Sequence, residues 1–224
     1  MEEEKNQKEH KKKEVKYEIL PSGYKGKSLS FKIIIIGDSG VGKSCLANRA
    51  TTNIFLENST TTIGIEFFDF HVKMFKKVIK LQIWDTCGQE LFHSLIKNYY
   101  NNASLAIIVY AINSKQSFEH INDWLKEIRS NSSPNTKIFL IGNKSDLDEE
   151  RVVTKEEGEK LAKDYNFELF LEASAKHGIN HHKIFVEAAK LLYQDFLRFN
   201  SQNPENNEKT LKKTENSNKK GGCC

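Results

Sequence analysis

A glycine-rich loop that directly follows an apolar run is the part of this chain best suited to chemistry. The run Ile33–Ile36 is followed at residues 37–44 by Gly-Asp-Ser-Gly-Val-Gly-Lys-Ser, which fits the phosphate-binding pattern Gly-x-x-x-x-Gly-Lys-Ser. Glycines let the backbone N–H groups converge on phosphate oxygens, and the helix that follows presents its positive end to them. Lys43 can reach the β and γ phosphates, and the Ser44 hydroxyl can ligate Mg²⁺. The residues expected to bind the phosphates are Ser39, Gly40, Val41, Gly42, Lys43, Ser44 and Cys45.

A second motif indicates which base the nucleotide carries. Asn143-Lys144-Ser145-Asp146 follows the apolar stretch 137–142, about 100 residues after the glycine-rich loop. Asp146 can accept hydrogen bonds from guanine N1–H and the exocyclic amine, whereas adenine would leave the carboxylate unpaired at a cost. Asn143 can contact N7, and the Lys144 stem can lie over the base. The backbone N–H groups of Ser174, Ala175 and Lys176 can meet the guanine carbonyl.

Between these motifs lies a segment suited to hydrolysis, Trp84-Asp85-Thr86-Cys87-Gly88-Gln89. Asp85 ends an expected strand and can hold Mg²⁺ through water, while the Gly88 N–H can bond the γ-phosphate. Gln89 is placed to orient an attacking water molecule.

The elements that position these motifs alternate between short apolar strands and amphipathic helices, which predicts an α/β fold with a mostly parallel sheet. The expected strands are 31–37, 65–74, 78–85, 104–111, 137–143 and 168–172. The expected helices are 43–52, 90–99, 117–130, 155–165 and 180–199. Because only Phe75-Lys76-Lys77 joins the second and third strands, they must form a hairpin, so one edge strand is antiparallel.

Composition divides the chain into three parts. Residues 1–30 are charged and low in apolar content, and we expect a flexible extension there, before a nucleotide-binding domain at 31–199. Residues 200–224 are rich in Asn, Lys, Glu, Ser and Thr, which predicts a disordered tail.

Charge and cysteine content exclude several classes of protein. The formal net charge is +4, and the basic excess lies in the two terminal parts, which leaves the domain neutral and argues against a nucleic-acid-binding face. Two of the 4 cysteines are adjacent at Cys223-Cys224, and no zinc-type spacing is present, so we expect neither a disulfide framework nor a zinc site. No apolar run is long enough to span a membrane, and no signal-peptide pattern is present.

Together these motifs resemble the small GTPases of the Ras superfamily, and within it the Rab family. The superfamily resemblance covers residues 31–199 and rests on the motifs at 37–44, 62–64, 84–90, 143–146 and 174–176. The Rab resemblance rests on Ile63-Gly64-Ile65-Glu66-Phe67, Tyr99-Tyr100 and the terminal Cys223-Cys224. Residues 144–147 and 155–159 resemble the branch that acts between the endoplasmic reticulum, Golgi and early endosomes.

The resemblance implies a P-loop NTPase fold in three layers, with a six-stranded sheet and about five helices. It also implies that Thr62 ligates Mg²⁺ and binds the γ-phosphate, and that Phe55 packs against guanine. Loss of the γ-phosphate would then loosen the loops at about 54–66 and 86–99, and effectors would sense this change. Effector contacts are implied for Ile63, Phe67, Trp84 and Tyr99.

The same resemblance implies a monomer that cycles between GTP and GDP in vesicle-mediated protein transport. Its partners would be an exchange factor, a GTPase-activating protein, effectors, and a dissociation inhibitor or escort protein. Geranylgeranyl chains on Cys223 and Cys224 would anchor it to the cytoplasmic face of endomembranes, with an inhibitor-bound pool in the cytosol.

Several residues depart from the family pattern and leave alternatives open. Cys87 replaces the usual Ala beside the γ-phosphate position, so one alternative is a GTP-binding switch with little intrinsic hydrolysis. Leu91, Asn101-Asn102 and Ala111 also differ from the usual Rab residues. A P-loop kinase or ATPase is disfavoured by Asn143–Asp146, and a Ras-like plasma-membrane GTPase by the Cys-Cys ending.

Overall fold

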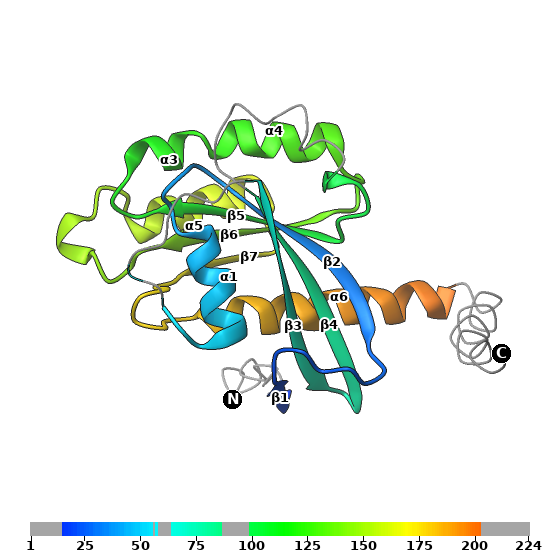
Figure 1. The fold of residues 1–224 in the computed structure, drawn as a ribbon. Coiled ribbons are helices and arrows are strands. Elements are labelled where there is room, and N and C mark those ends of the chain that lie inside the picture. The colour runs from blue at the N-terminus through cyan, green and yellow to red at the C-terminus, as the bar shows by residue number, and fades with distance from the viewer. Residues whose placement is uncertain (1–14, 56, 58–63, 87–98, 203–224) are drawn as a thin grey trace, which may run out of the picture.

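The computed structural model describes residues 15–55, 57, 64–86 and 99–202, which form an α/β fold around one mixed sheet. The strand order is β1-β3-β4-β2-β5-β6-β7 (Figure 1). The strands are β1 (Tyr17–Leu20), β2 (Leu29–Ile36), β3 (Ile65–Met74), β4 (Lys77–Thr86), β5 (Leu105–Ala111), β6 (Lys137–Asn143) and β7 (Leu169–Glu172). The pairs β1–β3 and β3–β4 are antiparallel, and the remaining pairs are parallel.

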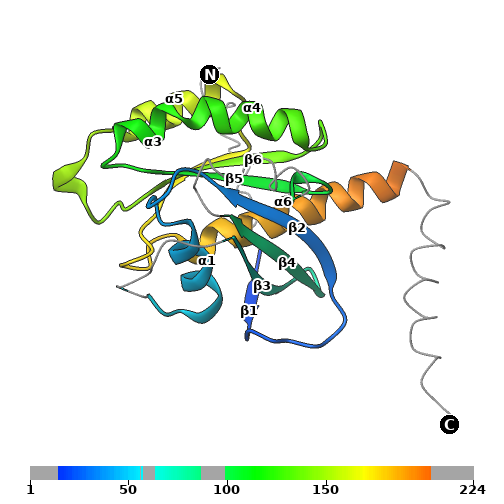
Figure 2. The same ribbon diagram turned by 45° about the horizontal axis from the view of Figure 1, so that its top comes forward.

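Helices cover both faces of the sheet, which gives three layers (Figures 1 and 2). Helices α1 and α6 lie on one face, and α3, α4 and α5 lie on the other. The helices are α1 (Lys43–Thr52), α3 (Lys115–Glu119), α4 (Ile121–Asn131), α5 (Lys155–Asp164) and α6 (His181–Gln202), with a short 3₁₀ turn at Asp148–Glu150.

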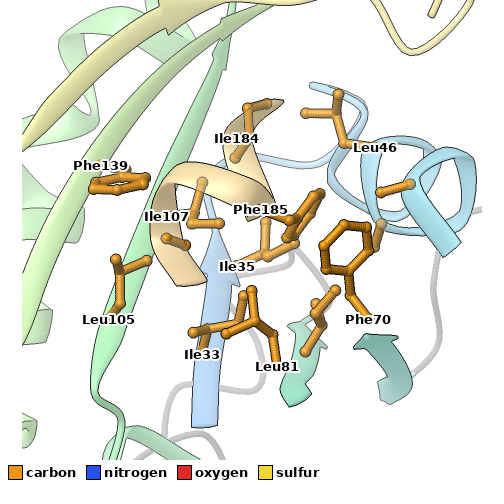
Figure 3. Close-up of a cluster of buried hydrophobic side chains, with 14 of the residues drawn as sticks. Ile33, Ile35, Leu46, Phe70, Leu81, Leu105, Ile107, Phe139, Ile184 and Phe185 are labelled. Carbon is orange, nitrogen blue, oxygen red and sulfur yellow. The ribbon is translucent and has the colours of Figure 1, made fainter. Parts of the chain in front are cut away.

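The central strands are apolar throughout because both of their faces are covered. Every residue of β5 is buried, as are Ile33–Ile36 at the end of β2. On the α1–α6 face, Figure 3 shows Ile35, Leu46, Phe70 and Phe185 in one cluster, with the two phenylalanine ring centroids 5.5 Å apart. This core fixes α1 against the end of β2 and thereby positions the loop between them.

The parallel register brings the functional motifs to one edge of the sheet. Ile35 pairs with Asp85 on β4, and Ala111 on β5 pairs with Asn143 on β6. The carboxyl ends of β2, β4, β5, β6 and β7 therefore meet, as ligand-binding edges of such sheets do.

The predicted hairpin is present and has a two-residue turn. Phe75 and Lys76 both have positive φ, at 51° and 61°, and Met74 pairs with Lys77. Positive φ at both central positions is typical of the type I′ turn, whose twist matches that of paired strands.

The structure confirms the predicted fold class and corrects three of its details. The sheet has seven strands rather than six, because residues 17–20 of the supposed flexible extension pair with β3 as β1. β3 is consequently not an edge strand along its second half. The single helix expected at 117–130 is divided at His120 into α3 and α4.

The other elements agree with prediction to within a few residues. Strands β3 and β6 and helix α1 have the predicted bounds. Helix α6 continues through Gln202, three residues into the tail predicted at 200–224, whose remainder lies outside the described residues. Of the helix expected at 90–99, only Tyr99 lies within the described residues, and it is helical.

Within the described ranges, no helix is both long and apolar enough to cross a membrane.

Candidate functional site

The glycine-rich loop leaves β2 in a conformation that suits glycine alone. Gly37 has φ of 139°, and a Cβ there would lie 2.1 Å from the Val109 carbonyl oxygen on β5. Gly42 has φ of 94°, and a Cβ there would lie 2.3 Å from Nδ2 of Asn143. Gly37 and Gly42 are therefore required because the loop backbone passes too close to β5 and to the Asn143 side chain of β6 for a Cβ atom to fit.

Helix α1 begins with its positive end directed at this loop. Its N-cap residue, Gly42, has no capping side chain, and the first turn contains no acidic residue. The first-turn N–H groups and the helix dipole therefore favour an anion at this position.

Lys43, the invariant lysine of the phosphate-binding pattern, is held over the start of the same loop. Its ammonium group donates to the carbonyl oxygens of Gly37 and Asp38, at 2.8 Å each, and the side chain is buried. A buried ammonium requires compensating acceptors, and phosphate oxygens are suitable ones.

Ser44 and Asp85 meet beside the loop and fit a divalent cation. The Ser44 hydroxyl donates to Oδ2 of Asp85, while Oδ1 of Asp85 is buried and has no hydrogen-bond partner among the residues that the structure describes. Burial raises the pKa of Asp85 to about 6, with Ser44 and Lys43 acting against this shift. A buried carboxylate oxygen without a partner is costly, and a hydrated Mg²⁺ would satisfy it. These two residues therefore suit the Mg²⁺ predicted for this site.

Asn143 connects the two predicted nucleotide-binding motifs. Its Nδ2 donates to the Val41 carbonyl oxygen at 2.8 Å, and its Oδ1 accepts from the Ala175 N–H at 3.3 Å. The side chain is buried. Asn143 therefore fastens the phosphate loop to the segment 174–176, a tie that the sequence motifs alone did not reveal.

Asp146 lies beside the same segment, as the guanine-recognition hypothesis requires. The Ser174 hydroxyl donates to Oδ1 of Asp146 and accepts from the His177 N–H at 2.9 Å. Lys144 has φ of 66°, so the chain turns sharply between Asn143 and Asp146. The structure thus brings Asn143, Lys144, Asp146, Ser174, Ala175 and Lys176 to one place.

The remaining predicted nucleotide contacts occupy several settings. Cys45 and Phe55 are half-buried and pack against the core under α1 and α6. Ser39 and Gly40 are exposed at the loop tip. The predicted Thr62, Ile63, Gly88, Gln89, Cys223 and Cys224 lie outside the described residues.

The three predicted effector residues within the described ranges form one aromatic group. The Phe67 and Trp84 ring centroids are 4.5 Å apart and nearly perpendicular, and those of Trp84 and Tyr99 are 5.5 Å apart. Phe67 is 63% exposed, whereas Trp84 and Tyr99 are half-buried. An apolar ring so exposed at the end of a rigid aromatic group is suited to a protein contact.

Sequence reasoning missed two sets of residues around this site. Lys32 lies 3.9 Å above the Trp84 ring centroid and donates to the Asn101 carbonyl, and burial lowers its pKa. Asp38 of the phosphate loop is bonded by His120 and Trp124. The partners lie 82 and 86 residues from Asp38, so no local pattern identifies them.

The arrangement as a whole places a candidate phosphate cradle, a candidate cation site and a candidate base-recognition loop at one sheet edge. It agrees with the comparison to known protein families. The Ras family model matches residues 32–194 of this chain.

Proposed function

Because the chain belongs to the Ras family, whose members bind GTP and hydrolyse it, we propose that it is a Rab-type switch in vesicle-mediated protein transport. GTP-bound protein recruits effectors to an endomembrane between the endoplasmic reticulum, Golgi and early endosomes. Hydrolysis to GDP and phosphate ends the recruitment. The observation that carries this proposal is the contiguous aromatic group Phe67, Trp84 and Tyr99, with Phe67 exposed.

The aromatic group is well placed to respond to the bound nucleotide. Trp84 immediately precedes Asp85 on β4, and Asp85 is hydrogen-bonded by Ser44 at the start of α1. Phe67 pairs with Trp84 across the β3–β4 ladder. A change at the candidate cation site would therefore have to pass only from Asp85 to its neighbour Trp84 to reach the aromatic group.

In this proposal each part of the site has one task in hydrolysis. Lys43 and the first turn of α1 hold the phosphates, and Mg²⁺ would be held by Ser44 and Thr62, with Asp85 contributing through water. The metal, when bound, neutralises charge that develops on the phosphate oxygens. Gln89 orients the attacking water, and Asp146 recognises guanine.

The intrinsic reaction is expected to be slow. Ras itself hydrolyses GTP at roughly 10⁻⁴ to 10⁻³ per second without a partner, and an activating protein accelerates it. Cys87 beside the γ-phosphate position leaves a second candidate function, a GTP-binding switch with little intrinsic hydrolysis.

Membrane attachment is proposed through the terminal cysteine pair. One lipid chain gives marginal binding to a bilayer, whereas two chains give a stable anchor. Two geranylgeranyl groups on Cys223 and Cys224 would therefore anchor the protein, and a dissociation inhibitor or escort protein would carry it through the cytosol. An exchange factor and an activating protein would set the nucleotide state.

A lipidation experiment tests the Rab assignment. Full-length protein is incubated with escort protein, Rab geranylgeranyl transferase and geranylgeranyl diphosphate, then weighed by mass spectrometry. The proposal predicts two added geranylgeranyl groups on the wild type and one on Cys223→Ser or Cys224→Ser. An unmodified wild type under conditions that modify a known Rab would contradict the assignment.

A fluorescence experiment tests whether the nucleotide state reaches the aromatic group. Tryptophan emission is compared between the GDP form and a form loaded with a non-hydrolysable GTP analogue. The proposal predicts a difference that is smaller in Trp84→Phe, in which the remaining tryptophan is Trp124, bonded to Asp38 of the phosphate loop. An identical difference in Trp84→Phe would contradict the coupling.

A further inference from the structure

The carboxylate of Asp38, in the phosphate loop, is held by two side chains from the opposite layer of the fold. His120 Nδ1 lies 2.7 Å from Oδ2, and the Trp124 indole N–H donates to Oδ1 at 2.8 Å. Both carboxylate oxygens are therefore bonded, and the side chain is only 19% exposed. The two partners lie one helical turn apart at the start of α4, where the backbone N–H of Trp124 donates to the backbone carbonyl of His120.

The same residue also holds the phosphate-binding lysine. The Asp38 carbonyl oxygen accepts from the Lys43 ammonium at 2.8 Å. The backbone carbonyl of Asp38 thus contacts Lys43, while the Asp38 side chain contacts the α3–α4 junction. A shift of the junction would therefore be transmitted to the phosphate cradle through a single residue.

The α3–α4 junction is itself anchored independently of the loop. Ser114 caps α3 by accepting from the Ser117 N–H at 3.3 Å, and the Ser117 hydroxyl accepts from the Ala111 N–H at the end of β5 at 3.1 Å. The Trp124 ring is buried in the core beneath α4. The donors for Asp38 are therefore presented from a rigid base.

An acidic residue in a loop that binds phosphates needs such a restraint. A carboxylate free to turn toward a polyanion would repel it, and the repulsion is strong where solvent is partly excluded. Two N–H donors that occupy both oxygens fix the carboxylate in place and disperse its charge.

We propose that His120 and Trp124 are positioning residues that hold the Asp38 carboxylate away from the nucleotide phosphates and so slow nucleotide release. Their effect depends on the Asp38 carboxylate, which distinguishes this role from ordinary packing of α4. Without the carboxylate, loss of the two donors has no consequence for the phosphates.

The experiment measures release of a fluorescent GDP analogue from the full-length, Mg²⁺-loaded protein in excess GDP. His120→Ala and Trp124→Phe each remove one donor, and Trp124→Phe retains most of the ring's packing. We expect each variant to release the nucleotide at least about 10-fold faster, in line with the loss of one hydrogen bond to a charged group. His120→Asn restores a donor and should return the rate toward that of the wild type, and the exposed Asn122→Ala on the same helix serves as the matched control.

A double-mutant cycle with Asp38→Ala decides between positioning and packing. If the proposal holds, His120→Ala and Trp124→Phe no longer accelerate release in the Asp38→Ala background. Equal acceleration in both backgrounds would overturn it, as would wild-type release rates in both single variants.

Discussion

The side-chain amide of Asn143 donates to the Val41 carbonyl oxygen at 2.8 Å, which ties the end of β6 to the phosphate loop 102 residues earlier in the chain. The same side chain accepts from the Ala175 N–H. One buried residue therefore ties the glycine-rich loop to the loops that we expect to recognise the base. This single amide therefore joins three segments that are distant in sequence: the end of β6, the glycine-rich loop and the loop at 174–176.

Asn143→Ala should therefore destabilise the fold and weaken GDP binding. Loss of both bonds leaves a buried carbonyl and a buried N–H unpaired, at about 1–3 kcal/mol each, and it frees the glycine-rich loop from the segment 174–176, so we expect a lower melting temperature and at least a tenfold rise in dissociation constant. Titration with a fluorescent GDP analogue measures this, with Asn122→Ala as control. Equal affinity in wild type and Asn143→Ala would show that the tie is not used.

Asp85→Asn should separate metal binding from stability. The uncharged amide avoids the cost of burying a carboxylate, whose pKa is raised to about 6, so melting in EDTA should occur at or above the wild-type temperature. The Mg²⁺ concentration that half-maximally slows GDP release should rise at least tenfold, because the carboxylate is lost. An unchanged Mg²⁺ requirement would contradict the assignment of Asp85 to the cation site.

Strand β1 should contribute measurably to stability. It pairs with β3 over four positions, and Val15 and Ile19 pack against the main core. Burial of such side chains is worth about 1–3 kcal/mol in total when partial. A truncation that removes residues 1–22 should lower the melting temperature by several degrees, whereas removal of residues 1–14 should not. Coincident melting curves for the two truncations would refute this.

Stability should fall on acidification because of a histidine pair at the start of α6. Burial lowers the pKa of both His181 and His182 below the ordinary value of 6.5, and the nearby Arg49 acts in the same direction. The unfolded chain therefore binds more protons than the folded one below about pH 7, so stability present above pH 6.5 is lost as pH falls.

The pH effect is measured by difference from a matched variant. Between pH 7.5 and 5.5, the melting temperature of the wild type should fall further than that of a His181→Asn/His182→Asn double variant. The raised pKa of Asp85 acts in the opposite direction, since protonation stabilises the folded form as pH falls through about 6, but this contribution is common to both proteins. Parallel curves would exclude the pair as the source.

Local patterns predicted most of the fold, and the exceptions have physical causes. β1 lies in a highly charged segment, and it forms because β3 offers an unpaired edge, which is a tertiary effect. The break at His120 lacks a glycine or proline, and its φ of −71° and ψ of −8° remain helical. No glycine or proline therefore marks the break at His120, whereas β1 does carry a local signal, the alternation of Val15, Tyr17 and Ile19 with charged residues.

Within the site, too, the residues of short motifs could be predicted and the long-range contacts could not. The glycines, Lys43, Ser44 and Asp85 belong to short motifs whose chemistry can be inferred from spacing. The bonds from Asn143 to Val41 and from Trp124 to Asp38 join residues 102 and 86 positions apart. Such contacts follow only from the strand order and the packing of α4, which no local motif contains.

The most direct test of the account is single-turnover GTP hydrolysis by the purified full-length chain with Mg²⁺, beside Cys87→Ala and Gln89→Leu variants. The account predicts slow phosphate release, on the order of 10⁻⁴ to 10⁻³ per second, unchanged in Cys87→Ala and reduced in Gln89→Leu. If the wild type releases no phosphate and Cys87→Ala does, the result would instead support the alternative of a GTP-binding switch with little intrinsic hydrolysis. Stable GTP binding with no phosphate release from wild type or Cys87→Ala would contradict the claim that this protein is a GTPase.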